Sequence, residues 1–217
     1  MHEANTAIHP LAILKPTRPP RLYTLEQYLR REEEGRERHE YYDGKITKLP
    51  MARGPRNIVV ANVMAALKMS VKSLSQKYLI YASQQLIYLP EINFSLYPDA
   101  MAVCGKPLYW DDNQVLLTNP ILIVEVLSRS TRTYDRIEKF AEYKTLPSFQ
   151  EYVLIEPDRC FVETRYREEL DLWRDTKVTD LTANVSLRSL GCSISLADIY
   201  ENIEFEPPKA KKTKGKR

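Results

Sequence analysis

The stretch "ILIVEVLSRSTRTYDRIEKF", residues 121–140, is the most informative about the fold because it joins a strand-like run to a helix-like run. Residues 121–127 are apolar except for Glu125, and such a strand is typical of a sheet interior covered on both faces. Alternation predicts two faces, one with Ile121, Ile123, Glu125 and Leu127, the other with Leu122, Val124 and Val126. A buried, ionised carboxylate is costly without a partner. The sequence therefore predicts a positive partner for Glu125, either a side chain or a metal ion.

The segments that follow indicate a sheet with helical connections. Residues 131–147 have a helical pattern that ends near Pro147, and "EYVLIEP", residues 151–157, is strand-like. Strand, helix and strand in this order predict a right-handed crossover between parallel strands. Further strands are expected at 78–89, 98–104 and 160–167, and the closely spaced later strands, "ELDLWRDT" and "VSLRSLGCSISL", are expected to form hairpins at the sheet edge.

Local signals also place elements in the N-terminal half. Thr24 and Gln27 form a capping-box pattern, which predicts a helix start. The pair Asp43 and Gly44 between strand-like flanks predicts a hairpin. From Ile58 to about Ser75, apolar residues recur at helical spacing, which predicts an amphipathic helix.

Composition limits the class of protein. At 217 residues and 43% hydrophobic, the chain is long enough for one substantial core. Three scattered cysteines, Cys104, Cys160 and Cys192, indicate neither a disulfide framework nor a zinc site. The first residues do not resemble a signal peptide, and no apolar window approaches the ~20 residues of a membrane span. We expect a soluble, cytoplasmic protein.

The charge is uneven along the chain. The formal net charge is +3, but residues 209–217, "KAKKTKGKR", hold six of the 32 basic residues, which leaves 26 basic against 29 acidic residues in the body. We predict an extended, proline-rich arm over 1–22, one domain over 23–206 and a basic disordered tail over 207–217. The tail would attract nucleic acid in a salt-dependent way, or act only as a solubilising end.

Three residues form a candidate catalytic set. Asp99 follows Pro98 at the start of a predicted strand, and two carboxylates on neighbouring strands can hold one Mg²⁺ at about 2.0–2.1 Å. Such a metal would neutralise Glu125 and activate water for attack on phosphorus. Lys139 lies four residues after Asp135, on the same helical face, and could orient the attacking water or stabilise the phosphorane. The alternatives are a strand-end Glu125 that reaches solvent or pairs with an arginine, and an exposed Asp135–Lys139 ion pair.

The segments "YPDAMAV", "LIVEVLSRST" and "YDRIEKFAEYKTLPSFQEYVLIEP" resemble the Uma2 family of restriction-endonuclease-like proteins, a branch of the PD-(D/E)XK nuclease fold. The likeness extends from "RHEYYDGKI" to "SLGCSISLADIY". It implies an α/β (α+β) fold with a mixed central sheet flanked by helices and edge hairpins. It also implies cleavage of DNA with Mg²⁺, for which Mn²⁺ can substitute, frequently a homodimer, and no organic cofactor.

The resemblance assigns roles residue by residue. The superfamily pattern has a lysine two residues after the strand acid, where this chain has Leu127. Uma2-like sequences typically carry the lysine on the following helix, and Lys139 matches it. Glu40, in "RHEYYDG", matches the acid of the first motif and is an accessory ligand candidate, with Asp135 as a second accessory residue.

Some residues depart from the family pattern. Arg56 and Asn57 stand where family members often have a histidine, and Arg129 replaces a usual proline. Arg129, Arg132 and Arg136 are candidates for phosphate contacts, although arginines near a helix start are usually solvated.

Two functions follow from these observations. The first is a Mg²⁺-dependent endodeoxyribonuclease. The alternative is a catalytically inactive module on the same fold that binds nucleic acid or another protein.

Overall fold

The computed structural model describes residues 21–51, 53–128 and 130–205. Nearly all of the predicted arm and the whole predicted tail therefore lie outside the described residues. Across these three ranges, no helix is both long enough and apolar enough to cross a membrane.

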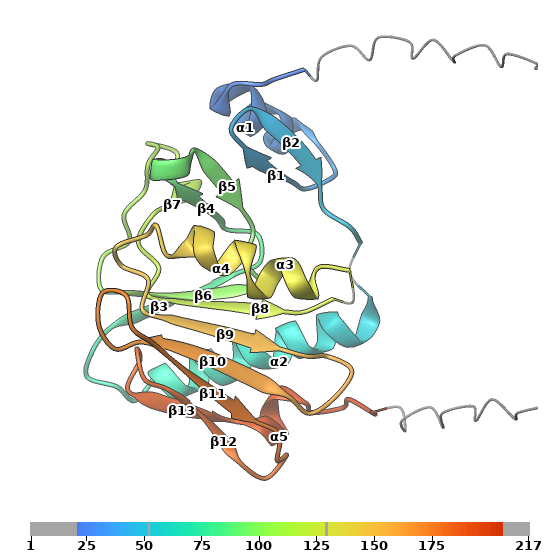
Figure 1. Cartoon of the computed structure of the whole chain (residues 1–217), viewed down its shortest axis with the longest axis vertical. Helices are drawn as coiled ribbons and strands as arrows, with labels where there is room; N and C mark the ends of the chain where they lie inside the picture. The colour runs from blue at the N-terminus through green and yellow to red at the C-terminus, as the bar shows by residue number, and fades with distance from the viewer. Residues whose placement is uncertain (1–20, 52, 129, 206–217) are drawn as a thin grey trace, which may run out of the picture.

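The structure is a mixture of helices and strands (Figure 1). Its helices are α1 (Leu25–Glu34), α2 (Gly54–Val71), α3 (Arg132–Arg136), α4 (Glu138–Tyr143) and α5 (Leu196–Ile199), with a 3-10 turn, η1 (Pro90–Ile92). Its strands are β1 (His39–Tyr42), β2 (Lys45–Lys48), β3 (Tyr78–Ala82), β4 (Leu86–Leu89), β5 (Phe94–Leu96), β6 (Ala100–Cys104), β7 (Leu116–Leu117), β8 (Leu122–Val126), β9 (Glu151–Ile155), β10 (Val162–Arg167), β11 (Trp173–Val178), β12 (Asn184–Leu187) and β13 (Cys192–Ser195). They form sheets ordered β11-β10-β9-β8-β6-β3, β2-β1-β5-β4-β7 and β12-β13.

Strand β8 lies inside the six-stranded sheet, as the sequence predicts. It is antiparallel to β6 and parallel to β9, so the predicted helical connection between parallel strands, through α3 and α4, is confirmed. The right hand of this crossover stays a prediction. Strands β10 and β11 form a hairpin at the edge of this sheet. Strands β12 and β13 also form a hairpin, as predicted. The prediction that this hairpin lies at the edge of the main sheet is wrong, because it forms a separate two-stranded sheet that contacts α2.

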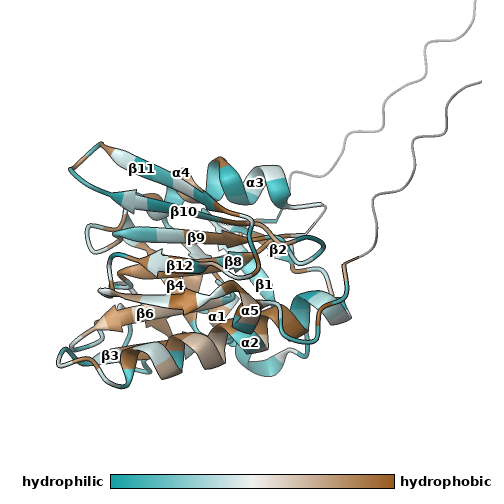
Figure 2. Cartoon of the chain, turned by 90° about the horizontal axis from the view of Figure 1, so that it is seen from below, coloured by the Kyte–Doolittle hydropathy of each residue, from teal (hydrophilic) through white to brown (hydrophobic). Residues whose placement is uncertain are grey.

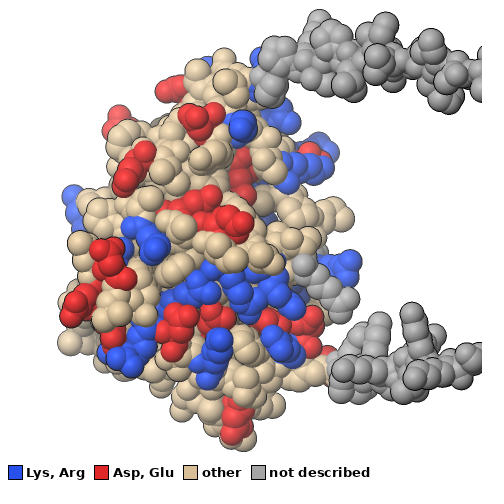
Figure 3. Space-filling view, viewed as in Figure 1, with Lys and Arg blue, Asp and Glu red and all other residues tan. Residues whose placement is uncertain are grey.

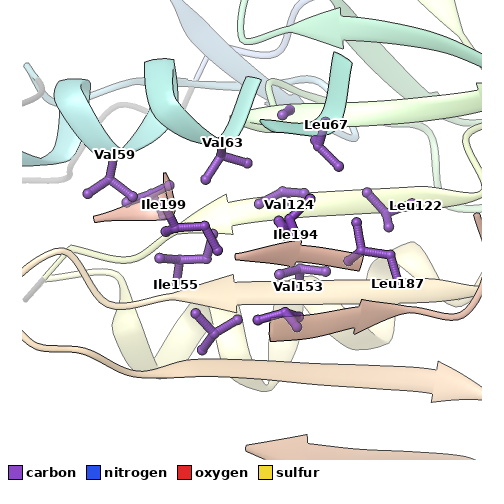
Figure 4. Close-up of a cluster of buried hydrophobic side chains, with 14 of the residues drawn as sticks. Val59, Val63, Leu67, Leu122, Val124, Val153, Ile155, Leu187, Ile194 and Ile199 are labelled. Atoms are coloured by element: carbon purple, nitrogen blue, oxygen red, sulfur yellow. The ribbon is translucent and has the colours of Figure 1, made fainter. Parts of the chain in front are cut away.

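Both faces of β8 are covered. On one face, Leu122 and Val124 pack with Val59, Val63 and Leu67 of α2 (Figure 4). On the other face, Ile123 and Leu127 pack among residues of β4, β5 and α4. The predicted alternation is therefore confirmed along the strand, but Ile121 packs on the α2 side because it precedes the first strand residue. In Figure 2 the ribbon of α2 carries brown, hydrophobic segments beside teal, hydrophilic ones.

The local signals in the N-terminal half are confirmed. Helix α1 has Thr24 as its N-cap, and both hydrogen bonds of the capping box with Gln27 are present. Asp43 and Gly44 have positive φ angles of 42° and 85° between β1 and β2, as a tight hairpin of this kind requires. Strand β1 pairs with β5, which attaches this hairpin to the five-stranded sheet.

Three predicted elements have different bounds. Residues 78–89 do not form one strand: β3 and β4 belong to different sheets and are separated by a turn in which the Gln85 amide donates to Ala82. The helix predicted over 131–147 is broken at Ile137, where φ is −114° and ψ is −69°. The amphipathic helix begins at Gly54, four residues before Ile58, because Pro55 suits a first helical turn.

Candidate active site

The ends of β6 and β8 bring Asp99 and Glu125 together. In this antiparallel pair Ala100 is opposite Val124, and continuing the register by one residue sets Asp99 opposite Glu125. The Val126 amide donates a hydrogen bond of 2.7 Å to Oδ2 of Asp99. Both acids are buried, with 4% of Asp99 and 3% of Glu125 exposed. The two predicted ligands are therefore neighbours at one end of the sheet.

The positive partner of Glu125 is a side chain of α4. Nζ of Lys139 lies 2.7 Å from Oε1 of Glu125, and the Tyr143 hydroxyl donates to the same oxygen at 2.7 Å. Lys139 and Tyr143 are four residues apart, so they project from one face of the helix. This pair of donors stabilises a carboxylate that would otherwise be buried without compensation.

Two further carboxylates lie around Lys139. Its Nζ is 3.7 Å from Oε1 of Glu40 and 3.9 Å from Oδ1 of Asp135, which is longer than a hydrogen bond. Asp135 instead accepts a hydrogen bond of 2.6 Å from the Thr131 hydroxyl. The alternative of an exposed Asp135–Lys139 pair is wrong, because each residue is only 5% exposed.

Arg56, in the first turn of α2, completes the cluster. Its Nη2 lies 2.7 Å and 2.6 Å from the two carboxylate oxygens of Asp99, and its Nε donates to the Val126 carbonyl at 2.8 Å. The sequence marked Arg56 only as a departure from the family pattern. Its contact with Asp99 spans 43 positions, so no local signal could have found it.

Burial and mutual repulsion shift the acids of this cluster. Burial first, and then the charge of Glu125, raises the pKa of Asp99 to about 6, and the same two causes raise the pKa of Asp135 to about 6. Burial also raises the pKa of Glu40. Burial alone would lower the pKa of Lys139, but Glu125, Glu40 and Asp135 outweigh it and raise that pKa. Lys139 is therefore a cation at neutral pH.

The donor set fits a hard divalent cation with few protein ligands. Four carboxylates, Asp99, Glu125, Glu40 and Asp135, surround two cationic side chains, Lys139 and Arg56. The Lys139 ammonium and the Tyr143 hydroxyl both contact Oε1 of Glu125. No group of three or more His, Cys, Asp or Glu residues in the described ranges is arranged to hold a metal. Two carboxylates completed by water are typical of Mg²⁺ rather than of an all-protein cage.

The predicted phosphate-binding arginines lie in an ion-pair network beside the site. Nη2 of Arg136 is 2.8 Å from Glu156, and its Nε is 3.3 Å from Glu163. Arg132 lies 3.2 Å from Glu156 and 3.3 Å from Asp158. Figure 3 shows this mixed band of basic and acidic side chains below α3 and α4. These ion pairs favour a structural role for Arg132 and Arg136, and their contact with phosphate stays a prediction. Arg129 lies outside the described residues.

The fold has a counterpart among solved structures. The chain is similar to a crystal structure from Anabaena variabilis ATCC 29413 described as "a putative nuclease belonging to DUF820". The TM-score is 0.65 with 18% identity, over 82% of this chain and 97% of that one. This likeness establishes the mixed α/β fold that the sequence predicts.

Sequence comparison gives the family. Residues 25–197 match Uma2, described as "Putative restriction endonuclease", and the chain belongs to this family. Two similar proteins come from Synechocystis sp. (strain ATCC 27184 / PCC 6803 / Kazusa). Uncharacterized protein sll1609 is 34% identical over 68% of this chain and 82% of its own length. Uncharacterized protein slr1290 is 30% identical over 83% of this chain and 92% of its own length.

Proposed function

We propose that the protein is a Mg²⁺-dependent endonuclease that hydrolyses DNA phosphodiester bonds, with Mn²⁺ as a substitute metal. Asp99 and Glu125 would bind the cation, and Glu40 would be an accessory ligand. The observation that carries the proposal is the placement of two facing carboxylates and a buried lysine at one end of β6 and β8. Membership of a family described as restriction endonucleases supports the choice of substrate.

The roles of the residues follow from their charges and positions. A divalent cation, when bound, would activate a water molecule and neutralise charge that develops on the phosphate. Lys139 is held as a cation by its three acidic neighbours, so it would act as an electrostatic stabiliser or orient the attacking water rather than accept a proton. Tyr143 holds the Glu125 carboxylate in place through its hydrogen bond.

Cleavage of plasmid DNA tests this proposal. Purified protein would be incubated with supercoiled plasmid and Mg²⁺, Mn²⁺ or EDTA, and nicked and linear products would be measured. Glu125→Gln and Asp99→Asn remove charge at nearly constant volume and should abolish cleavage. The matched control is Glu138→Gln, an exposed acid immediately before Lys139, which should cleave normally. Equal cleavage by wild type and Glu125→Gln, or cleavage in EDTA, would contradict the proposal.

One observation favours the alternative of an inactive module that binds nucleic acid or protein. Lys139 already pairs with Glu125 and Arg56 with Asp99, so the two acids have partners without a metal. Calorimetric titration with Mg²⁺ and Mn²⁺ separates the two functions. If the protein is an inactive module, no cation binding should be lost in Asp99→Ala. If it is the endonuclease, the wild type should bind a cation and Asp99→Ala should not.

Assembly and location stay predictions. The family resemblance implies a homodimer, which sedimentation of the purified chain would test. A cytoplasmic location is likewise expected from the sequence alone, as is the absence of an organic cofactor.

A further inference from the structure

The guanidinium of Arg56 joins the ends of two strands at the candidate metal site. Its Nη2 contacts both oxygens of Asp99 on the β6 side, and its Nε donates to the Val126 carbonyl of β8. Oδ2 of Asp99 also accepts from the Val126 amide. Two protein nitrogen atoms, Nη2 of Arg56 and the Val126 amide, therefore make three contacts with a carboxylate that, under the proposed function, must coordinate a metal.

Simultaneous binding of a metal cation and the Arg56 guanidinium to Asp99 is unfavourable. A cation about 2.0–2.1 Å from an Asp99 oxygen would lie within about 5 Å of the guanidinium nitrogen that contacts the same oxygens. Two positive centres at that separation, in a largely buried site, repel strongly. Arginine is charged at every accessible pH, so deprotonation cannot relieve this repulsion.

The Arg56 side chain is also placed so that it can move away from Asp99. Its side chain is 27% exposed, compared with 15% for Glu40 and 7% or less for Asp99, Glu125, Lys139 and Asp135. It stands in the first turn of α2, near the end of that helix rather than inside its packed length. Rotation of one long side chain toward solvent would expose Asp99 without movement of the sheet.

We propose that Arg56 and the divalent cation compete for Asp99, so that Arg56 acts as a built-in counterion that must be displaced before the metal binds. The inference rests on the proposed function, because it requires a metal site at Asp99. It concerns the regulation of that site. The guanidinium stabilises the buried acid when metal is scarce and reduces the apparent affinity for metal by the cost of breaking its own contacts.

Metal binding by variants of the full chain tests the competition. Free Mn²⁺ would be followed by electron paramagnetic resonance during titration of wild type, Arg56→Ala and Arg56→Gln. Loss of a charge-assisted contact to a buried carboxylate should tighten Mn²⁺ binding by about tenfold or more. The matched control is Arg53→Ala, which removes an exposed positive charge three residues earlier. It should change the affinity by no more than about threefold, because only long-range attraction is altered.

The outcomes separate this inference from the proposed function. If Asp99→Asn abolishes Mn²⁺ binding and Arg56→Ala binds no more tightly than Arg53→Ala, the competition is wrong while the metal site stands. If Asp99→Asn does not affect Mn²⁺ binding, the metal site itself is wrong and the competition falls with it. If both Arg56 variants bind Mn²⁺ more tightly than wild type and Asp99→Asn does not bind it, the result supports both the metal site and the competition.

A measurement on the wild-type protein covers the case in which Arg56 variants do not fold. Uniform labelling with nitrogen-15 and carbon-13 gives an Nε–H signal for Arg56, assigned on the wild-type protein through its side-chain carbons. Saturating Mg²⁺ should shift this signal and speed its exchange with water, because Nε leaves the Val126 carbonyl. An unchanged Arg56 signal at saturating Mg²⁺ would overturn the competition.

Discussion

Nζ of Lys139 lies 2.7 Å from Oε1 of Glu125, and both side chains are almost fully buried. An acid in the most apolar strand is thus neutralised by a lysine from the next helix. Removing Lys139 would leave the Glu125 carboxylate buried without its cation, which is far more costly than the loss of a surface ion pair. The pair is therefore both a stabilising contact and part of the candidate active site.

Lys139→Met should destabilise the protein by about 3–5 kcal/mol, because the carboxylate of Glu125 would lose its cation. Urea denaturation with and without Mg²⁺ measures this loss, and added Mg²⁺ should restore part of it if Glu125 is a metal ligand. Lys68→Met, at an exposed position of α2, is the control and should change stability by about 0.5 kcal/mol or less. Wild-type stability in Lys139→Met would show that the ion pair contributes little.

Tyr143→Phe should lower both stability and cleavage. The hydroxyl donates to Oε1 of Glu125 in a fully buried setting, so its loss should cost about 1–3 kcal/mol. Cleavage should fall by about tenfold, because a Glu125 carboxylate that is held less firmly would position the metal ion poorly. Tyr152→Phe is the matched control: its hydroxyl donates to the Asp135 carbonyl, so stability should fall without a comparable loss of cleavage. Equal activity losses in the two variants would argue against a specific effect on Glu125.

The raised pKa of Asp135 predicts that the stability of the protein depends on pH. Its pKa is raised from 3.8 to about 6, mainly by burial and then by Glu125, so the folded state binds its proton more tightly than the unfolded state does. The resulting stabilisation is fully present below pH 3.8 and is lost as the pH rises through about 6. Asp135→Asn should remove up to about 3 kcal/mol of this pH-dependent change.

Urea denaturation between pH 4 and pH 7.5 compares wild type with Asp135→Asn. The control is Asp175→Asn, an exposed acid of β11, which should retain the wild-type dependence. Identical pH profiles for wild type and Asp135→Asn would contradict the raised pKa.

Arg136→Met distinguishes structural from phosphate-binding arginines. Arg136 pairs with Glu156 and Glu163, which are 1% and 4% exposed, so the variant should lose about 1–3 kcal/mol of stability. Its affinity for a labelled oligonucleotide should keep the wild-type salt dependence, measured by fluorescence anisotropy. Unchanged stability together with a salt slope reduced by about 1 would instead identify Arg136 as a phosphate contact.

Features that depend on neighbours along the chain could be predicted from the amino-acid sequence. The capping box of Thr24 and Gln27, the tight turn at Asp43 and Gly44, and the alternation through 122–127 all appear as expected. Each results from backbone geometry within a few residues, where residue type and spacing carry the information. The buried acid at 125 was also evident, together with its need for a positive partner.

The partner of Glu125 and the positions at which the long elements break depend on tertiary packing. The run at 78–89 divides because its halves pair with strands of different sheets, and the helix predicted over 131–147 breaks at Ile137. The contact of Arg56 with Asp99 joins residues 43 positions apart. Such contacts depend on how helices and strands pack together in space, which residue spacing along one segment does not specify.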